Sequence, residues 1–206
     1  MIFKLYNKHI FPHLLNQVMQ TPSLMQARGQ LLHKIQGTCL EIGFGTGLNL
    51  AFYQNIDLLY ALEPSQELWD LASDRLKQTN FEVKQIIGVA ENIPLADASV
   101  DHVISTWTMC SIAKLPEALA EIHRVLKPNG TFSFVEHVLS DNKKLQTLQH
   151  LLTPVQKKLA DGCHLNRDIE RIITDAGFRP VEMNYFDAKG IPSIGQRMLL
   201  AQVSKA

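Results

Sequence analysis

Short apolar runs alternate with helix-length segments from residue 38 onward. The runs occupy residues 39–42, 58–62, 83–87, 100–105 and 131–135. Such spacing is typical of βα units, in which helices connect parallel strands. Two later strands, near residues 179–187 and 196–203, are separated by a loop alone, so we expect them to pair antiparallel. The pattern predicts an α/β fold built on a mostly parallel sheet.

Local signals indicate where several helices begin and end. Ser65 is suited to cap one helix, and Pro116 is suited to the first turn of the next. That second helix is expected to end at the turn sequence of residues 127–130. Asn166 is the expected N-cap of a later helix, and Gly177 is expected to supply its left-handed C-terminal residue.

The first 36 residues carry apolar stripes of their own. Pro12 and Pro22 divide this segment, so we expect two or three short helices that lie on the main body. We expect residues 1–36 to form an N-terminal helical appendage and residues 37–206 to form the main domain. The positions at helical spacing are Leu14 with Val18, Leu15 with Met19, and the row Leu24, Ala27, Leu31 and Ile35.

Composition narrows the class of protein. The 206 residues suffice for one ordinary domain, and 20 basic side chains balance 20 acidic ones, so the net charge does not favour nucleic-acid binding. No apolar run approaches the length of about 18 residues that a membrane-spanning helix needs, and the N-terminus offers no signal segment. The N-terminal composition therefore predicts a cytoplasmic protein, and Cys39, Cys110 and Cys163, which lack CxxC spacing, are expected to be reduced thiols.

The most informative stretch follows the first expected strand. Gly43, Gly45 and Gly47 stand at alternate positions between an apolar run and a helix-length segment. Glycine lets the backbone approach a ligand closely, and a following helix N-terminus favours polar or negative groups. Leu48 and Asn49 stand where the dinucleotide fingerprint requires its third glycine, so a pyrophosphate is the less favoured ligand. A tight turn without a ligand is the alternative.

A carboxylate ends the second expected strand. Glu63 stands where an acidic side chain can accept hydrogen bonds from both hydroxyls of a ribose. Pro64 biases Glu63 toward an extended conformation, so its side chain should project from the carboxyl edge of the sheet. A solvated carboxylate at a helix start is the alternative. The loop of residues 88–95, after the third strand, offers backbone amides and a polar side chain to an aromatic ring.

These three segments together resemble the class I S-adenosylmethionine-dependent methyltransferases. Among them, the chain is similar to the methyltransferase type 11 group of ubiquinone and menaquinone biosynthesis. The resemblance covers residues 38–177 and includes the tracts at 99–105 and 121–130. It implies a Rossmann-like, seven-stranded, mostly parallel sheet with an antiparallel last strand and helices on both faces. It also implies S-adenosylmethionine as cofactor and S-adenosylhomocysteine as product.

The resemblance also assigns residues to parts of the cofactor. Glu41, the glycine loop and Thr106 would hold or face the methionine end. Glu63 would bind the ribose, and Ala90 and Glu91 would flank or hydrogen-bond the adenine. The expected cofactor-binding residues are Glu41, Gly43, Phe44, Gly45, Gly47, Glu63, Pro64, Ala90, Glu91 and Thr106.

A second resemblance concerns the methyl acceptor. Residues 135–138 and 161–168 are similar to the alkyl-thiol methyltransferases known from animal membranes and to related bacterial proteins. Taken together, the two resemblances imply in-line methyl transfer to a small apolar thiol or to a quinone-like phenol or enol. The chain departs from the animal enzymes in lacking an apolar N-terminal anchor. Contact with a membrane is therefore expected, at most, at the surface through the N-terminal helices.

Three other functions stay open at this point. A nicotinamide-dependent oxidoreductase would share the arrangement of strand, glycine loop and helix. A methyltransferase could instead act on a phospholipid headgroup amine. A catalytically silent partner could retain the cofactor pocket as a structural relic.

Some methyl acceptors must be deprotonated, and this requirement points to candidate bases. Methyl transfer from a sulfonium mainly requires alignment of acceptor, methyl carbon and sulfur, but a thiol, phenol or enol must also lose a proton. His137, just past the fifth strand, is the first candidate base, with a loop-orienting role as the alternative, and His164 is the second. Only His9 and His13 have the spacing of a helical ligand pair, and Pro12 separates them, so no metal site is expected.

Two further segments are candidates for the walls of the site. Trp107, Met109 and Cys110 follow the fourth strand and are expected to line an apolar acceptor pocket, with ordinary core positions as the alternative. Residues 6–15 are expected to fold over the cofactor as a lid. Packing on the sheet's edge and contact with a bilayer are the alternatives for this segment, and its few lysines make the bilayer the least favoured.

Overall fold

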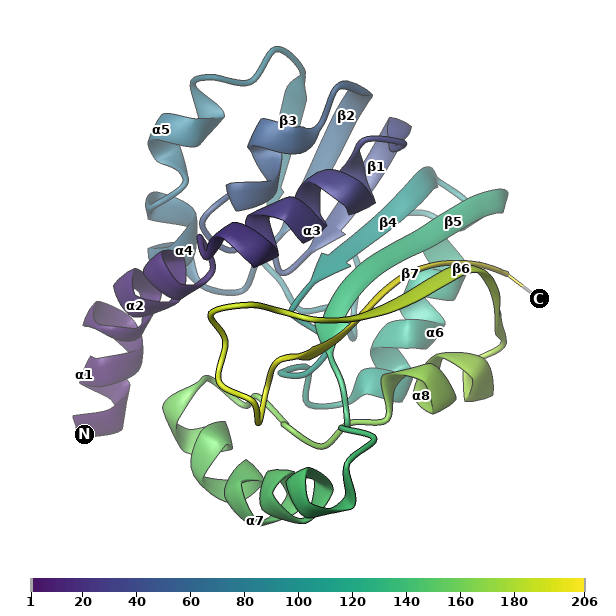
Figure 1. Cartoon of the computed structure of the whole chain (residues 1–206). Coiled ribbons are helices and arrows are strands. Elements are labelled where there is room, and N and C mark those ends of the chain that lie inside the picture. The colour runs from purple at the N-terminus through teal and green to yellow at the C-terminus, as the bar shows by residue number, and fades with distance from the viewer. Residues whose placement is uncertain (1, 206) are drawn as a thin grey trace.

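A seven-stranded sheet in the order β3-β2-β1-β4-β5-β7-β6 forms the centre of the protein (Figure 1). The structure is a computed structural model that describes the backbone of residues 2–205 and the side chains of residues 5–205. Neighbours from β3 through β5 pair in parallel, and β7 pairs antiparallel with both β5 and β6. The expected fold class is confirmed. The strands are β1 Gln36–Ile42, β2 Asn55–Leu62, β3 Glu82–Ile86, β4 Val100–Thr106, β5 Leu126–His137, β6 Phe178–Asp187 and β7 Arg197–Lys205.

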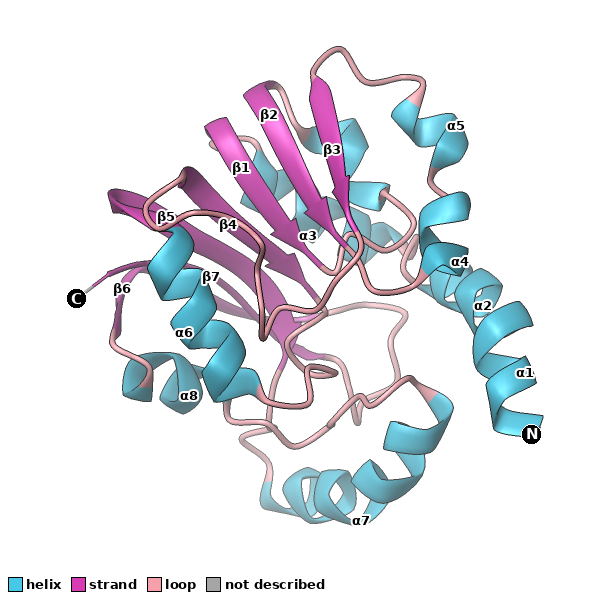
Figure 2. Cartoon of the chain, turned by 180° about the vertical axis from the view of Figure 1, so that it is seen from behind, coloured by secondary structure: helices cyan, strands magenta, loops and turns pink. Residues whose placement is uncertain are grey.

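Helices cover both faces of this sheet (Figures 1 and 2). α3, α4 and α5 lie over one face, and α6 and α8 lie over the other. α7 lies beyond the carboxyl ends of the strands, as do α1 and α2 at the far end of α3. The helices are α1 Ile2–His9, α2 Phe11–Val18, α3 Pro22–Leu32, the 3₁₀ helix η1 Leu48–Phe52, α4 Gln66–Asp70, α5 Ser73–Leu76, α6 Leu115–Val125, α7 Lys143–Leu159 and α8 Ile169–Asp175.

The N-terminal segment is divided as its prolines predict, but only part of it packs on the sheet. The row on and just after α3 is buried and shares an apolar cluster with β1 and β2. Leu14 and Val18 of α2 are instead 47% and 54% exposed. The expectation that the N-terminal helices lie on the main body is therefore confirmed for α3 and wrong for this face of α2, because Leu14 and Val18 border the open cavity instead of the sheet.

Other local expectations are partly corrected. Ser65 caps α4, since its Oγ accepts a hydrogen bond from the Leu68 amide at 3.2 Å. Asn166 does not cap α8; Asp168 does, because its carboxylate accepts from the Arg171 amide, directly before the helix. The glycine loop leads into η1, a short 3₁₀ helix, and not into the expected longer helix. Residues 127–130 lie at an irregular start of β5 and form no separate turn.

Candidate functional site

A cavity of about 720 Å³ lies at the carboxyl ends of the parallel strands. The loops after β3, β2, β1 and β4 and the end of β5 all contribute to its wall, in the order in which the strands stand in the sheet. α1, α2 and α7 close its outer side. Open α/β sheets bind ligands at this edge, next to the point where the strand order reverses. Here the reversal falls between β1 and β4, at the middle of the cavity.

The glycine loop is fixed tightly to the neighbouring strand. The amides of Gly43 and Phe44 both donate to the carbonyl oxygen of Leu62, at 2.9 and 3.1 Å. Gly43 has a φ of +68°, and a Cβ at this position would stand 2.2 Å from Thr108 Oγ1. Only glycine satisfies both conditions, so the residue keeps β1 and the loop after β4 in close contact.

Glu63 projects into the cavity from the end of β2, as its position before Pro64 predicts. Its Oε2 accepts a hydrogen bond from the Gly45 amide at 2.8 Å, and its Oε1 accepts from the Ser65 amide at 2.9 Å. Burial raises the pKa of Glu63, and these two backbone hydrogen bonds oppose the rise. Pro64, Ala90 and Glu91 line the cavity beside it. One wall therefore carries a buried carboxyl group next to the glycine loop.

A buried arginine faces the same cavity and was missed in the sequence. Arg28 is 4% exposed; its Nη1 donates to Asn49 Oδ1 at 2.6 Å and to Thr106 Oγ1 at 2.9 Å. Its guanidinium lies 4.8 Å from the centre of the Trp107 ring. Burial lowers the pKa of Arg28 to about 10, a value at which the side chain is still charged at neutral pH. The sequence does contain a signal for its burial: Arg28 follows Leu24 by four residues, so both lie on the same, buried face of a helix.

Arg28 is a cation with spare hydrogen-bonding capacity in the cavity wall. Both of its side-chain hydrogen bonds go to neutral groups, and its Nε is buried with no partner among the described residues. A buried charge is stable only when paired or well hydrogen-bonded. The site therefore suits a ligand with an anionic end, such as the carboxylate of S-adenosylmethionine.

Glu41 does not line the cavity. Its carboxylate accepts from Asn49 Nδ2 at 2.9 Å and from the Tyr53 hydroxyl at 2.7 Å, and it is 1% exposed. Burial raises the pKa of Glu41 to about 7, against the opposing effects of Tyr53, Arg28 and Asn49. Asn49 thus connects Glu41 to Arg28, so an influence of Glu41 on a ligand would be indirect. Gly47 is likewise absent from the cavity wall, while Thr106 is part of it.

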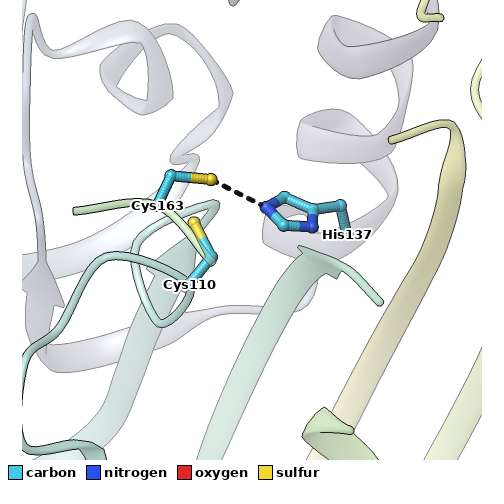
Figure 3. Close-up of side chains that lie close together, drawn as sticks. All are labelled: Cys110, His137 and Cys163. Atoms are coloured by element: carbon cyan, nitrogen blue, oxygen red, sulfur yellow. Dashed lines mark hydrogen bonds between the residues drawn. The ribbon is translucent and has the colours of Figure 1, made fainter. Parts of the chain in front are cut away.

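The other end of the cavity is rich in sulfur. His137 ends β5, and its Nε2 lies 3.2 Å from Cys163 Sγ in the loop after α7 (Figure 3). Cys110, in the loop after β4, points toward the same place. Hydrogen bonds from Cys110 and then from His137 lower the pKa of the Cys163 thiol to about 4. Burial lowers the pKa of His137, but its interactions with Cys163 outweigh this and raise it.

The remaining candidates divide between wall and interior. Trp107 and Cys110 line the cavity as expected, but Met109 is fully buried in the core, so its expected place in the acceptor pocket is wrong. The backbone turns there, with a φ of +54° at Trp107. His164 lies behind the wall, with Nδ1 3.0 Å from the Cys110 carbonyl oxygen. Glu136, directly before His137, accepts hydrogen bonds from the amides of Thr108 and Met109.

Comparison with known proteins agrees with this geometry. Residues 40–134 match the family described as Methyltransferase domain. A thiol S-methyltransferase TMT1B of Rattus norvegicus is 35% identical over 153 residues, which cover 72% of this chain and 62% of that protein. A phosphatidylethanolamine N-methyltransferase of Cereibacter sphaeroides is 25% identical over 84% of this chain and 81% of its own length. A SAM-dependent methyltransferase from Aquifex aeolicus has the same fold, with a TM-score of 0.64 at 17% identity over 93% of this chain and 97% of its own.

Fold, glycine loop and family match agree on the class: residues 40–134 match the methyltransferase domain family, and the chain has the fold of the class I S-adenosylmethionine-dependent methyltransferases. Within this class it is similar to the thiol S-methyltransferases, and it matches 62% of the length of the rat protein. S-adenosylmethionine is the cofactor of the class. Across residues 2–205, no helix has both the length and the apolar character needed to cross a bilayer.

Proposed function

We propose that the protein transfers the methyl group of S-adenosylmethionine to the sulfur of a small apolar thiol. One observation carries this proposal: a single cavity joins the glycine loop, Glu63 and Arg28 to a wall that contains Cys110, His137 and Cys163. The first group suits the cofactor, and the second is where an acceptor would lie. Similarity to a thiol S-methyltransferase supports the same acceptor class.

The order of the strands suggests how the cofactor would lie. Parallel neighbours stand about 4.8 Å apart, so successive loops along the edge would contact successive parts of an extended ligand. We propose that Ala90 and Glu91, after β3, flank the adenine and that Glu63, after β2, accepts hydrogen bonds from the ribose. The loop after β1 and the Arg28 guanidinium would then hold the methionine end, next to Thr106 at the end of β4.

The chain's own residues mainly have to align the reactants. S-adenosylmethionine supplies a methyl group already activated on a sulfonium. Holding acceptor and donor in line can lower the barrier by roughly 7–11 kcal/mol. The acceptor thiol must lose its proton before or during attack, and among the candidate bases His137 reaches the cavity while His164 does not. We therefore propose His137 as the residue that receives or directs this proton.

Two measurements test the proposed function. S-adenosylhomocysteine should raise the melting temperature, by an amount that corresponds to about 2.7 kcal/mol at a concentration 100 times the Kd, and Glu63→Ala should reduce this shift. Labelled methyl from S-adenosylmethionine should then appear on alkyl thiols in a panel that also contains phenols and amines. Stabilisation by NADH alone would support an oxidoreductase instead. Methylation of phenols without any thiol product would support a methyltransferase but would contradict a thiol as the acceptor.

A second candidate acceptor is a phospholipid headgroup amine. The rim of the cavity, which we define as α1, α2 and α7, favours this acceptor. α1, α2 and α7 contain no aspartate or glutamate, and the hydroxyl of Tyr6 in α1 hydrogen-bonds the Leu159 carbonyl in α7 at 3.2 Å. An apolar and basic surface of this kind suits an anionic bilayer. The exposed apolar side chains are Leu5, Ile10, Leu14, Val18, Leu148, Leu151, Leu152, Val155 and Leu159, and the exposed lysines are Lys8, Lys143, Lys144, Lys157 and Lys158.

Vesicles distinguish this candidate from the first. We expect the protein to sediment with phosphatidylglycerol vesicles more than with phosphatidylcholine vesicles, and less at high salt. Lys157→Glu should weaken this binding, whereas Lys34→Glu, which changes a lysine outside the rim, should not. Methyl transfer to phosphatidylethanolamine in such vesicles, without transfer to thiols, would make the headgroup amine the acceptor. Equal sedimentation with both lipids would contradict binding of the basic rim to an anionic bilayer.

The cysteines also bear on where the protein acts. Cys39, Cys110 and Cys163 are all buried and free of disulfides. We propose a reducing compartment such as the cytoplasm, because thiols in such compartments stay reduced. Alkylation of unfolded protein taken directly from cells should label all three thiols, and a disulfide between any two of them would contradict this compartment.

A further inference from the structure

Three segments far apart in the sequence bring two thiols and an imidazole to one point. Cys110 comes from the loop after β4, His137 from the end of β5, and Cys163 from the loop after α7 (Figure 3). Their sulfur and nitrogen atoms all lie within 4.8 Å of one another. Tetrahedral zinc binds sulfur at about 2.3 Å and imidazole nitrogen at about 2.0–2.1 Å, which sets ligand atoms roughly 3.5 Å apart. Shifts of about 1 Å would therefore close the cluster around an ion.

The backbone around the three side chains is braced. The His164 amide donates to the Cys110 carbonyl oxygen at 2.9 Å, which ties the two cysteine loops together. Arg167 donates to the carbonyl oxygens of Met109 and Ile112, on both sides of Cys110. Glu136, which precedes His137, accepts from the Met109 amide at 2.7 Å. These bonds hold the three residues together before any ligand binds.

We propose that Cys110, His137 and Cys163 bind one Zn²⁺ ion whose fourth position faces the cavity and receives the acceptor thiol. All three residues line the cavity, so an ion among them would be open to it. Two thiolates neutralise the charge of Zn²⁺, and three protein ligands with one open position are the usual composition of a catalytic zinc site. The absence of CxxC or paired-histidine spacing concealed this cluster in the sequence, because its members meet only in three dimensions.

This inference rests on the proposed function and changes one role within it. An acceptor thiol that binds to zinc gives up its proton to water at the cavity mouth and becomes a thiolate. Its sulfur lone pair then forms the new bond to the methyl carbon, the bond from that carbon to the sulfonium breaks, and the electron pair remains on the sulfur of S-adenosylhomocysteine. No oxidant or reductant is needed. His137 would act as a ligand, and the metal would take the place of a base.

Metal content tests the site independently of activity. Wild-type protein equilibrated with zinc sulfate and then gel-filtered should carry one zinc per chain by elemental analysis. Co²⁺ in its place should give thiolate-to-cobalt charge-transfer absorption and the visible bands of a tetrahedral centre. Cys110→Ser, Cys163→Ser and His137→Gln should each weaken zinc binding by more than ~100-fold, since even changes behind a ligand cost 10–100-fold.

Matched controls separate the site from general effects. Cys39→Ala removes the third buried thiol, and His150→Gln removes an exposed imidazole; both should keep the zinc stoichiometry of the wild type. Zinc should also protect Cys110 and Cys163 of the wild-type protein from iodoacetamide, a measurement that depends on no variant. Each variant's folding is checked by its stabilisation with S-adenosylhomocysteine.

Wild-type protein that carries no zinc and shows no protection of the two thiols would overturn the inference. Zinc that stays bound in Cys163→Ser would do the same. If S-adenosylhomocysteine still stabilises such zinc-free protein and thiols are still methylated, the proposed function stands with His137 as base. If the cofactor product does not bind at all, the proposed function fails, whatever the zinc content.

Discussion

Two buried ionisable side chains, Arg28 and Glu41, both hydrogen-bond to the side-chain amide of Asn49. Asn49 accepts from Arg28 through its Oδ1 and donates to Glu41 through its Nδ2. Burying charges without direct pairing costs stability. This loss of stability is consistent with a ligand site, because Arg28 keeps hydrogen-bond donors available for an anion instead of using them on Glu41.

Arg28→Met tests which part of the cofactor this arginine binds. A hydrogen bond to a charged group contributes about 1.5–3 kcal/mol, so the Kd of S-adenosylhomocysteine should rise about 10- to 100-fold in calorimetric titration. 5′-Methylthioadenosine lacks the amino-acid carboxylate and serves as the control, since its Kd should stay unchanged. An equal loss of affinity for both ligands would mean that Arg28 supports the cavity and does not bind the carboxylate.

Glu41→Gln tests the electrostatic cost of the buried carboxyl group. Its folded pKa of about 7 lies above the ordinary 4.5, so between these values the unfolded chain is ionised while the folded protein keeps the proton. Stability from this group is therefore present below pH 4.5 and is lost as pH rises to about 7, by about 3 kcal/mol. Urea unfolding at both pH values should show this fall reduced in the variant. Parallel pH dependences of wild type and variant would contradict the shift.

The loop after β1 illustrates how one element depends on another. Gly43 meets Thr108 from the loop after β4, and both loops contribute to the cavity. Asn16 of α2 adds a second connection, because its Oδ1 accepts from Thr46 Oγ1 at 2.7 Å. The glycine loop is thus held between β2, the loop after β4 and α2, and its shape is decided by these neighbours as well as by its glycines.

Gly43→Ala should destabilise the protein more than Gly177→Ala. Both glycines have positive φ, but a Cβ at Gly177 meets nothing within 4 Å whereas one at Gly43 meets Thr108. Backbone strain costs each variant about 1–2 kcal/mol, and the overlap adds about 1–3 kcal/mol for Gly43→Ala. Thermal unfolding measures the difference. Adding Thr108→Ala should restore the stability lost through the overlap but not the stability lost through backbone strain. No increase in stability would contradict this explanation.

At the scale of the whole molecule, the N-terminal segment and the main domain share a core. Ala27, Leu31 and Leu32 of α3 belong to the same apolar cluster as Leu59 and Ala61 of β2. The expected lid, residues 6–15, lies within α1 and α2, which precede this buried helix directly in the chain. The predicted boundary at residue 36 therefore does not separate two hydrophobic cores.

Unfolding should accordingly occur in one cooperative transition. Calorimetry should give equal calorimetric and van't Hoff enthalpies. S-adenosylhomocysteine should raise this single melting temperature, and it should slow amide exchange in α2, which contacts the glycine loop through Asn16. A separate early transition that reports only on residues 1–36 would contradict the shared core. Unchanged exchange in α2 would remove its role as a lid.

Much of this protein was predictable because local rules act over short distances. The succession of strands and helices, the antiparallel end, the glycine loop and the position of Glu63 all follow from periodicity, glycine spacing and the residue before Pro64, whereas the order of the strands within the sheet was not predicted. Family resemblance supplied the cofactor. Cap choice at Asp168 and the exposure of Leu14 and Val18 were not predicted, since competing local options differ little in energy until packing selects one.

The amino-acid order alone thus dictated the helices and strands, their succession along the chain, and the positions of the glycine loop and Glu63 at the ends of their strands. These features depend on neighbours within a few residues. Tertiary structure alone decided that Arg28 faces the cavity, that Glu41 lies behind it and that Cys110, His137 and Cys163 meet. These pairings join positions tens of residues apart, and only the packing of the sheet, α3 and the loop after α7 brings them within bonding distance.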